Sequence, residues 1–290
     1  MKILRIFIVL LLGLFLFECG GQKATLTIDV TKPMNIEYKG IKGKAFPYKA
    51  EAFANIVYID PVDNAEKITD QSVDYTCSYM YLEDEVSGDL SYQIILGDMT
   101  VSTSFMRAKP QIKAFRRLKG RRVRFSLGKK GGIKNVKELD VVRMEADMPF
   151  NPVDQIYTNF IRLPDKPVKK GDSWTATVTA PLTSLQLQGE LKFTDNCTLE
   201  DIEIKKGIEC HKISFVRDAE YSGNINLPGL NYEINGKGKE KGNFWFDSKR
   251  GIIVLIESTS TEKVISGLPQ FPTAKVEINI SGKYKFELKE

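Results

Sequence analysis

Residues 276–288 read VEINISGKYKFEL, and this stretch decides the fold. Apolar side chains or glycine occupy every second position, with polar residues between them: Val276, Ile278, Ile280, Gly282, Tyr284, Phe286 and Leu288. A repeat of two residues indicates a β-strand, and one apolar face is typical of an antiparallel sheet that covers a core. Burying six large apolar side chains gains about 1.5–3 kcal/mol each, whereas ordering the 13 residues costs about 1–2 kcal/mol each. This strand therefore needs neighbours that share its core.

Similar alternation recurs through much of the chain, for example in residues 53–59, 73–81, 90–96 and 185–193. The sequence therefore predicts a mainly β protein, built on a curved antiparallel sheet or half-barrel.

Two hairpins resemble each other. Residues 125–133 and 244–252 both place an aromatic strand before a Lys/Arg-Gly turn and an aliphatic return. This similarity suggests two related lobes. We expect a first β lobe over residues 25–150 and a second over residues 151–290, with one continuous domain made from both as the alternative.

The N-terminus predicts export. Two basic residues precede residues 6–17, an apolar run of 12 residues that is too short to span a membrane, which takes about 20. Residues 16–20 read LFECG, which resembles a bacterial lipoprotein signal, although that family favours a small residue where this chain has Glu18. The resemblance implies a signal peptide over residues 1–18, an acylated Cys19 and a lipidated tether over residues 19–24. An ordinary exported protein that is cut nearby is the alternative.

The lipoprotein resemblance also implies a location. We expect the protein in the bacterial cell envelope, anchored to a membrane by its lipid, with the periplasmic side of the outer membrane as the expected site. The 290 residues include 42 basic and 37 acidic side chains, which is an ordinary globular composition. Export removes the usual nucleic-acid partners, so we expect no nucleic acid to bind.

Three cysteines remain after Cys19. An oxidising envelope permits a disulfide, and Cys197 and Cys210 flank one predicted hairpin, so they are the candidate pair. Three separate buried thiols, including Cys77, are the alternative, because the turn at residues 205–207 does not place Cys210 opposite Cys197. The spacings match no zinc pattern, and we predict neither a metal nor a cofactor.

A tyrosine stripe marks a candidate cavity. Tyr75, Tyr79 and Tyr81 lie at strand spacing, and Tyr92 follows on the next predicted strand. Such a row can line an apolar ligand cavity, or it can be ordinary core with hydroxyl groups at the rim.

Residues 107–134 hold 12 lysines and arginines and no acidic residue. Lysine and arginine protect exposed strands from aggregation, so a solvated face is one interpretation. A surface that faces anionic lipid head groups is the other. The candidate membrane-facing residues are Arg116, Arg117, Arg121, Arg122 and Arg124.

A short helix is predicted near residues 152–162, with Asn151 as its N-cap and Pro152 in its first position. Residues 163–174 follow and read LPDKPVKKGDSW. This segment, together with the glycine-rich stretch and hairpin at residues 236–251, resembles a family of uncharacterised bacterial envelope lipoproteins. The resemblance covers about residues 110–290 and carries no catalytic residue to this chain.

The sequence favours binding over catalysis. His211 is the one histidine, and no G-x-S-x-G elbow, H-E-x-x-H pair or phosphate-binding glycine loop occurs. We therefore expect a non-enzymatic lipoprotein that binds a hydrophobic ligand, such as a lipid or a lipoprotein, or an envelope partner. An analogy with the half-barrels of lipoprotein-localisation carriers favours this interpretation. A structural or assembly lipoprotein without a ligand is the alternative, and a hydrolase is the third. Sequence alone fixes neither the ligand nor the oligomeric state.

Overall fold

The computed structural model describes residues 28–140, 152–183, 187–227, 230–268 and 271–289. The expected signal peptide, Cys19 and the tether lie outside these residues. Among the helices that are described, none is long and apolar enough to cross a bilayer.

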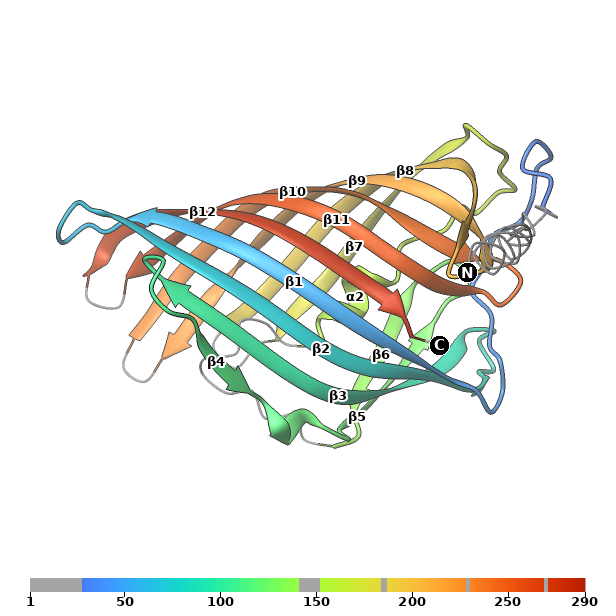
Figure 1. The fold of residues 1–290 in the computed structure, drawn as a ribbon, viewed down its shortest axis with the longest axis horizontal. Coiled ribbons are helices and arrows are strands. Elements are labelled where there is room, and N and C mark those ends of the chain that lie inside the picture. The colour runs from blue at the N-terminus through green and yellow to red at the C-terminus, as the bar shows by residue number, and fades with distance from the viewer. Residues whose placement is uncertain (1–27, 141–151, 184–186, 228–229, 269–270, 290) are drawn as a thin grey trace, which may run out of the picture.

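Within the described residues, twelve strands form one antiparallel sheet (Figure 1). Their bounds are β1 (Ala45–Ile59), β2 (Glu66–Asp84), β3 (Leu90–Phe105), β4 (Gln111–Ala114), β5 (Arg122–Leu127), β6 (Ile133–Glu138), β7 (Ser173–Thr183), β8 (Leu187–Lys205), β9 (Ile208–Leu227), β10 (Leu230–Asp247), β11 (Ile252–Leu268) and β12 (Phe271–Leu288). A single helical turn, η1 (Arg116–Leu118), and one short helix, α2 (Gln155–Asn159), complete the described elements.

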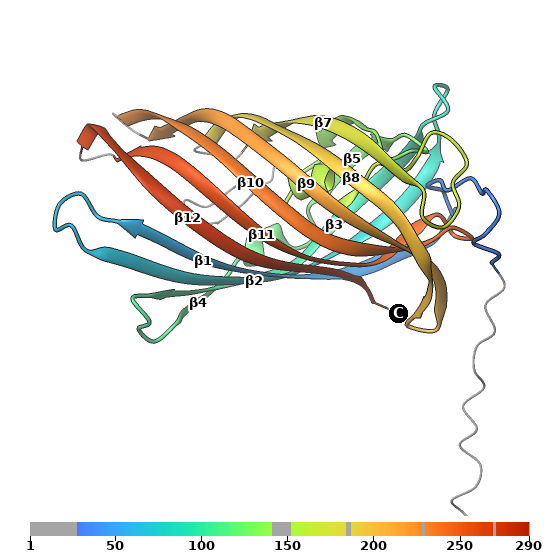
Figure 2. The ribbon, with the colours of Figure 1, turned by 90° about the horizontal axis from the view of Figure 1, so that it is seen from above.

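The strand order is β6-β5-β3-β2-β1-β12-β11-β10-β9-β8-β7, and β4 pairs with β3 beside this path. The first and last long strands meet in the middle of the sheet, where β1 pairs with β12 from Tyr48 opposite Leu288 to Tyr58 opposite Ile278. The sheet curves so that β1, β2 and β12 face β7, β8 and β9 across a concave interior, and it does not close into a barrel (Figures 1 and 2). The predicted mainly β, curved antiparallel fold is confirmed, and the boundary at residue 150 between two lobes stays a prediction.

Strand β12 has the faces that its sequence predicts. Phe286 and Leu288 are buried in the core, and Lys283 is exposed on the convex side. Glu287 differs, because it lies on the polar face and is nevertheless buried. Three lysines compensate the charge of this buried carboxylate. Lys289 donates a hydrogen bond to Glu287, and Lys285 and Lys206 form ion pairs with it. Together they lower the pKa of the Glu287 carboxyl to about 2.

The segment after residue 151 crosses the concave interior and carries α2 (Figure 1). The helix is shorter than predicted. Residues 152–154 form a turn, five residues are helical, and Asn151 lies outside the described residues. The chain leaves the helix early because Phe160 enters the aromatic core, where its ring centroid lies 5.3 Å from that of Tyr79. It then runs extended to the point where the Trp174 indole donates to the Arg162 carbonyl at 2.9 Å.

On one side of α2 the interior is filled by aromatic rings. Tyr48 and Phe286 stack with their centroids 4.5 Å apart, and Tyr38 packs edge-on against Phe246 at 5.2 Å. Offset and edge-to-face contacts of this kind stabilise a core beyond the area that they bury. This packed side holds α2 in place and leaves the other half of the concave face open.

Candidate functional site

Small side chains hollow out the concave face beyond α2. In β10 the sequence GKGKEKG covers residues 236–242, and strand alternation turns Gly236, Gly238, Glu240 and Gly242 towards the interior. The neighbouring strands also place small residues there. Gly282 of β12 pairs with Ser260 of β11 on one side and with Ala54 of β1 on the other. Because these positions contribute little volume, the sheet cannot fill its own concave side there.

The result is a cavity of about 640 Å³. This volume is in the range of sites that hold a small molecule, roughly 300–1,000 Å³. Residues Thr158 and Asn159 of α2 form its inner end. Its walls are mainly apolar and are formed by Ile56, Leu191, Phe193, Phe215, Tyr221, Ile234, Ile256, Val264, Ile278 and Ile280.

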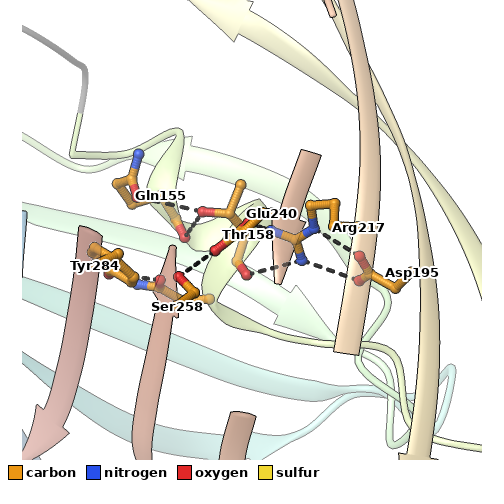
Figure 3. A network of polar contacts seen from close by, with 8 residues as sticks. Gln155, Thr158, Asp195, Arg217, Glu240, Ser258 and Tyr284 are labelled. Atoms are coloured by element: carbon orange, nitrogen blue, oxygen red, sulfur yellow. Dashed lines mark hydrogen bonds and ion pairs between the residues drawn. The ribbon is translucent and has the colours of Figure 1, made fainter. Parts of the chain in front are cut away.

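A buried ion network lies beside α2 (Figure 3). Asp195, Arg217 and Glu240 occupy one row across β8, β9 and β10, because Arg217 pairs with both of the others in the strand register. The Arg217 guanidinium binds both carboxylate oxygens of Asp195, with Nε–Oδ1 at 2.7 Å and Nη2–Oδ2 at 3.0 Å. Its Nη1 donates to Glu240 Oε2 at 3.2 Å.

The same network connects the sheet to the helix. Arg217 Nη2 donates to the Thr158 carbonyl at 3.4 Å, and Ser258 Oγ donates to Glu240 Oε1 at 2.6 Å. The Tyr284 hydroxyl donates to Asn159 Oδ1 at 2.8 Å from the other wall. Burial by itself lowers the pKa of Arg217, but Asp195 and Glu240 outweigh it and raise that pKa above its usual range. Removing one member would leave a buried charge unpaired.

The carboxyl group of Glu262 on β11 also lines the cavity, and it receives less support than that of Glu240. Among the described residues the one hydrogen bond to Glu262 comes from the Tyr221 hydroxyl and is long, at 3.5 Å. Burial first, and then the negative charge of Glu240, raise the pKa of Glu262. The stem of Glu262 lies over Gly238, and the ring of Tyr221 lies over Gly236, at positions where any larger residue would collide with them.

Of the two interpretations of the tyrosine stripe, the structure agrees with ordinary core and not with a lining for this cavity. Tyr75, Tyr79 and Tyr92 are buried in the packed half of the interior, and none of the four stripe tyrosines lines the cavity. Tyr79 packs against Tyr48 and Phe160, and the Tyr92 hydroxyl donates to the Lys39 carbonyl at 2.6 Å. Tyr81 sits at the rim and donates to Asp84 at 2.9 Å. Aromatic rings at strand spacing therefore mark the core here, whereas the alternate glycines in residues 236–242 mark the hollow.

The candidate disulfide is not formed, and the alternative of three separate buried thiols describes this structure. Cys77, Cys197 and Cys210 are all free thiols in this structure. Cys197 belongs to the main core on the concave face, whereas Cys210 packs with Trp245 and Leu255 in a second cluster. Burial raises the pKa of each thiol to about 12, which makes all three poor nucleophiles.

The predicted basic residues are exposed, away from the cavity. Arg116 and Arg117 lie in η1, and the other three lie at the start of β5 or directly before it. Arg122 pairs with Asp140, with Nε–Oδ2 at 2.8 Å.

His211 lies outside the cavity lining. It is buried, and its Nε2 lies 2.7 Å from Met34 Sδ. Burial lowers its pKa. Across the described residues no group of three or more His, Cys, Asp and Glu side chains is arranged to hold a metal ion.

Residues 151–253 match the model of a family of unknown function, DUF6263. The match covers about a third of the chain and agrees with the expected resemblance to an uncharacterised family. Among curated proteins no relative matches the sequence.

One similar solved structure is described as "lipid-protein interactions in lipovitellin". It shares 11% identity with this chain at a TM-score of 0.45, and the match covers 87% of this chain but 26% of that one. A likeness this low carries no argument about the present protein.

Proposed function

We propose that this protein is a lipoprotein of the bacterial envelope that binds a hydrophobic ligand, a lipid or the acyl part of a lipoprotein, without catalysing a reaction. The observation that supports the proposal is the cavity of about 640 Å³ beyond α2, with its mainly apolar walls. An open apolar space of this size is costly to leave to water, and an apolar ligand would remove that cost.

The free energy gained by burial favours a ligand with a long hydrocarbon chain. Each CH₂ group moved from water into the cavity contributes about 0.8 kcal/mol, so ten of them contribute on the order of 8 kcal/mol. Association costs about 4–15 kcal/mol in lost freedom of motion. For a hydrocarbon chain of about this length, the free energy gained by burial therefore roughly equals the cost of association. A longer chain or a polar contact gives net binding.

The end of the sheet that holds the cavity carries a candidate surface for a lipid or a partner. The turn after β3 lies beside the start of β2, since Met106 N donates to the Ile68 carbonyl at 2.8 Å. The ends of β1 and β3 and the turns that follow them expose Ile59, Val62, Phe105 and Met106. Large apolar side chains that gather at hairpin ends are typical of a surface that meets lipid or a partner. The Ile28 amide, which donates to Glu209 at 2.7 Å, places the start of the described chain at the opposite end of the sheet, so a tether on Cys19 would leave these apolar ends pointing away from the anchoring bilayer.

The two alternatives have less support. A scaffold without a ligand leads us to expect a packed interior, and the concave face is packed on one side of α2 alone. A hydrolase would need His211 beside a serine and an acid in a cleft. His211 instead lies against Met34, outside the cavity lining.

The test is to fill the cavity. Ala54→Phe places a ring over Gly282, inside the cavity, whereas Ser281→Phe adds the same ring to the exposed face of the neighbouring strand. We expect lipid to co-purify with the parent protein and with Ser281→Phe, and to be lost from Ala54→Phe. Native mass spectrometry followed by lipid extraction measures this. A parent protein that carries no lipid after expression in bacteria would count against the proposal, as would equal lipid in both variants.

A further inference from the structure

The cavity is apolar along most of its walls but presents a distinct set of charges. Three carboxyl groups line it, those of Asp154 at the start of the α2 segment, Glu240 on β10 and Glu262 on β11. Arg217 is the cation whose side chain faces it. Lys239 and Lys283 also border it, but their side chains alternate to the exposed face, and Lys239 pairs with Asp218 there.

The guanidinium group of Arg217 is already paired within the protein. Asp195, Glu240 and the Thr158 carbonyl accept hydrogen bonds from all three guanidinium nitrogens. Among the described residues whose side chains turn into the cavity, a carboxylate or phosphate head group would therefore find no free cationic donor and would face carboxyl groups instead. Like charges in a site of low dielectric repel strongly.

Glu262, in contrast to Arg217, has hydrogen-bonding capacity that the protein does not fill. Each carboxylate can accept up to about four hydrogen bonds, and Glu262 receives one long bond from Tyr221. Glu240 is better satisfied, because Ser258 and Arg217 both donate to it. Glu262 can therefore accept further hydrogen bonds from a ligand. It lies in the cavity among apolar side chains.

We propose that the cavity binds long-chain amines, in which a hydrocarbon chain lies along the apolar walls and an ammonium group donates to Glu262. This assignment rests on the proposed function and specifies the chemistry of its ligand. The strand register places Glu262 beside Ile280 on β12 and beside Gly238 on β10. Val264 and Ile278 pair in the next inward-facing row, so a chain with its ammonium at Glu262 contacts apolar side chains at once.

Glu262 is fixed in a position to receive such a group. Its stem lies over Gly238, and the Tyr221 ring, which rests on Gly236, holds the phenol hydroxyl beside the carboxyl group. Burial and then the negative charge of Glu240 raise the pKa of Glu262, so both disfavour its charged form. An ammonium from a ligand would compensate that charge.

The experiment compares three ligands with the same chain. The processed full-length protein, delipidated in detergent, is titrated with decylammonium, decanol and decanoate at about pH 8, well above the usual glutamate range. Native mass spectrometry measures occupancy. We expect decylammonium to bind about tenfold more tightly than decanol, because a hydrogen bond to a charged partner contributes more than a neutral one. Decanoate should bind most weakly.

Two variants locate the effect. Glu262→Gln should reduce decylammonium binding to the level of decanol and leave decanol unchanged, whereas Glu257→Gln on the exposed face of the same strand should behave as the parent. If all three ligands bind equally, or decanoate binds best, the amine assignment is wrong and the proposed function stands. If none of them binds, both fail. Loss of decanol binding in Glu262→Gln would also contradict the assignment, which gives Glu262 a role at the head group alone.

Discussion

At the scale of single residues, Glu262 shows how a binding group can weaken the protein that carries it. Burial and the charge of Glu240 raise its pKa in the folded state. A carboxyl group whose pKa is higher in the folded than in the unfolded state destabilises the fold wherever it is charged. That cost is present near neutral pH. It begins to shrink as the pH falls through the folded pKa and is gone below the unfolded pKa, where both states carry the proton.

We therefore expect Glu262→Gln to raise the free energy of unfolding of the ligand-free protein near neutral pH, by on the order of 1 kcal/mol. The gain should shrink as the pH falls towards about 4, where an unperturbed glutamate is itself half protonated. Urea denaturation at the two pH values measures it, with Glu257→Gln as the exposed control. An equal gain at both pH values would mean that charge is not the cause.

The residues of the ion network could not be found from the sequence. Asp195, Arg217 and Glu240 lie on three different strands. The alternation of polar and apolar residues does not decide whether their side chains point into the interior or out to solvent. Only the register of β8, β9 and β10 shows that the three share one row. The tyrosine stripe left two interpretations open for a related reason. Its alternation correctly predicted an inward face, but whether an inward face is packed or hollow depends on what the opposite wall contributes.

At the scale of elements, β12 is the strand whose behaviour its sequence predicted best, since charged and apolar side chains alternate there without a break. The structure adds that its inner face is not uniform. Phe286 is buried in the aromatic core, whereas Ile278 is partly exposed and lines the cavity. The same substitution should therefore have different effects at the two positions.

We expect Phe286→Asp to unfold the protein, because it removes a large core side chain, which alone costs about 3–5 kcal/mol, and buries an unpaired charge. Ile278→Asp, which sequence alone would rank as equally severe, should leave a folded protein that has lost most of its ligand affinity. Thermal unfolding by circular dichroism separates the two outcomes. If Ile278→Asp unfolds as completely as Phe286→Asp, then that end of the cavity is packed in solution and is not open.

At the scale of the whole molecule, the sequence predicted strands and curvature but not how the sheet is joined. Hairpins between consecutive strands follow from short turns, whereas the pairing of β1 with β12 joins residues that are far apart in the chain. Local patterns carry no information on such a contact. The same pairing makes the walls of the cavity, because it brings Ala54 of β1 beside Gly282 of β12.

The surface of the whole molecule allows a test of the membrane assignment that is independent of the cavity. Arg116, Arg117, Arg121 and Arg124 are exposed around η1 and the start of β5. Each basic side chain near an anionic bilayer contributes about 1 kcal/mol. With Cys19→Ser to remove the lipid, changing these four arginines to glutamine should weaken binding to anionic vesicles by on the order of 100-fold or more, and by less at high salt.

The matched control removes the same charge from another surface. Lys192, Lys237, Lys239 and Lys263 are exposed on the convex side of β8, β10 and β11, and three of them pair with acidic residues there. Changing these four to glutamine should have a much smaller effect on vesicle co-sedimentation if the arginines face the membrane. Equal losses in the two variants would show that net charge alone drives the binding, and the arginines would then be a solvated face that protects the sheet.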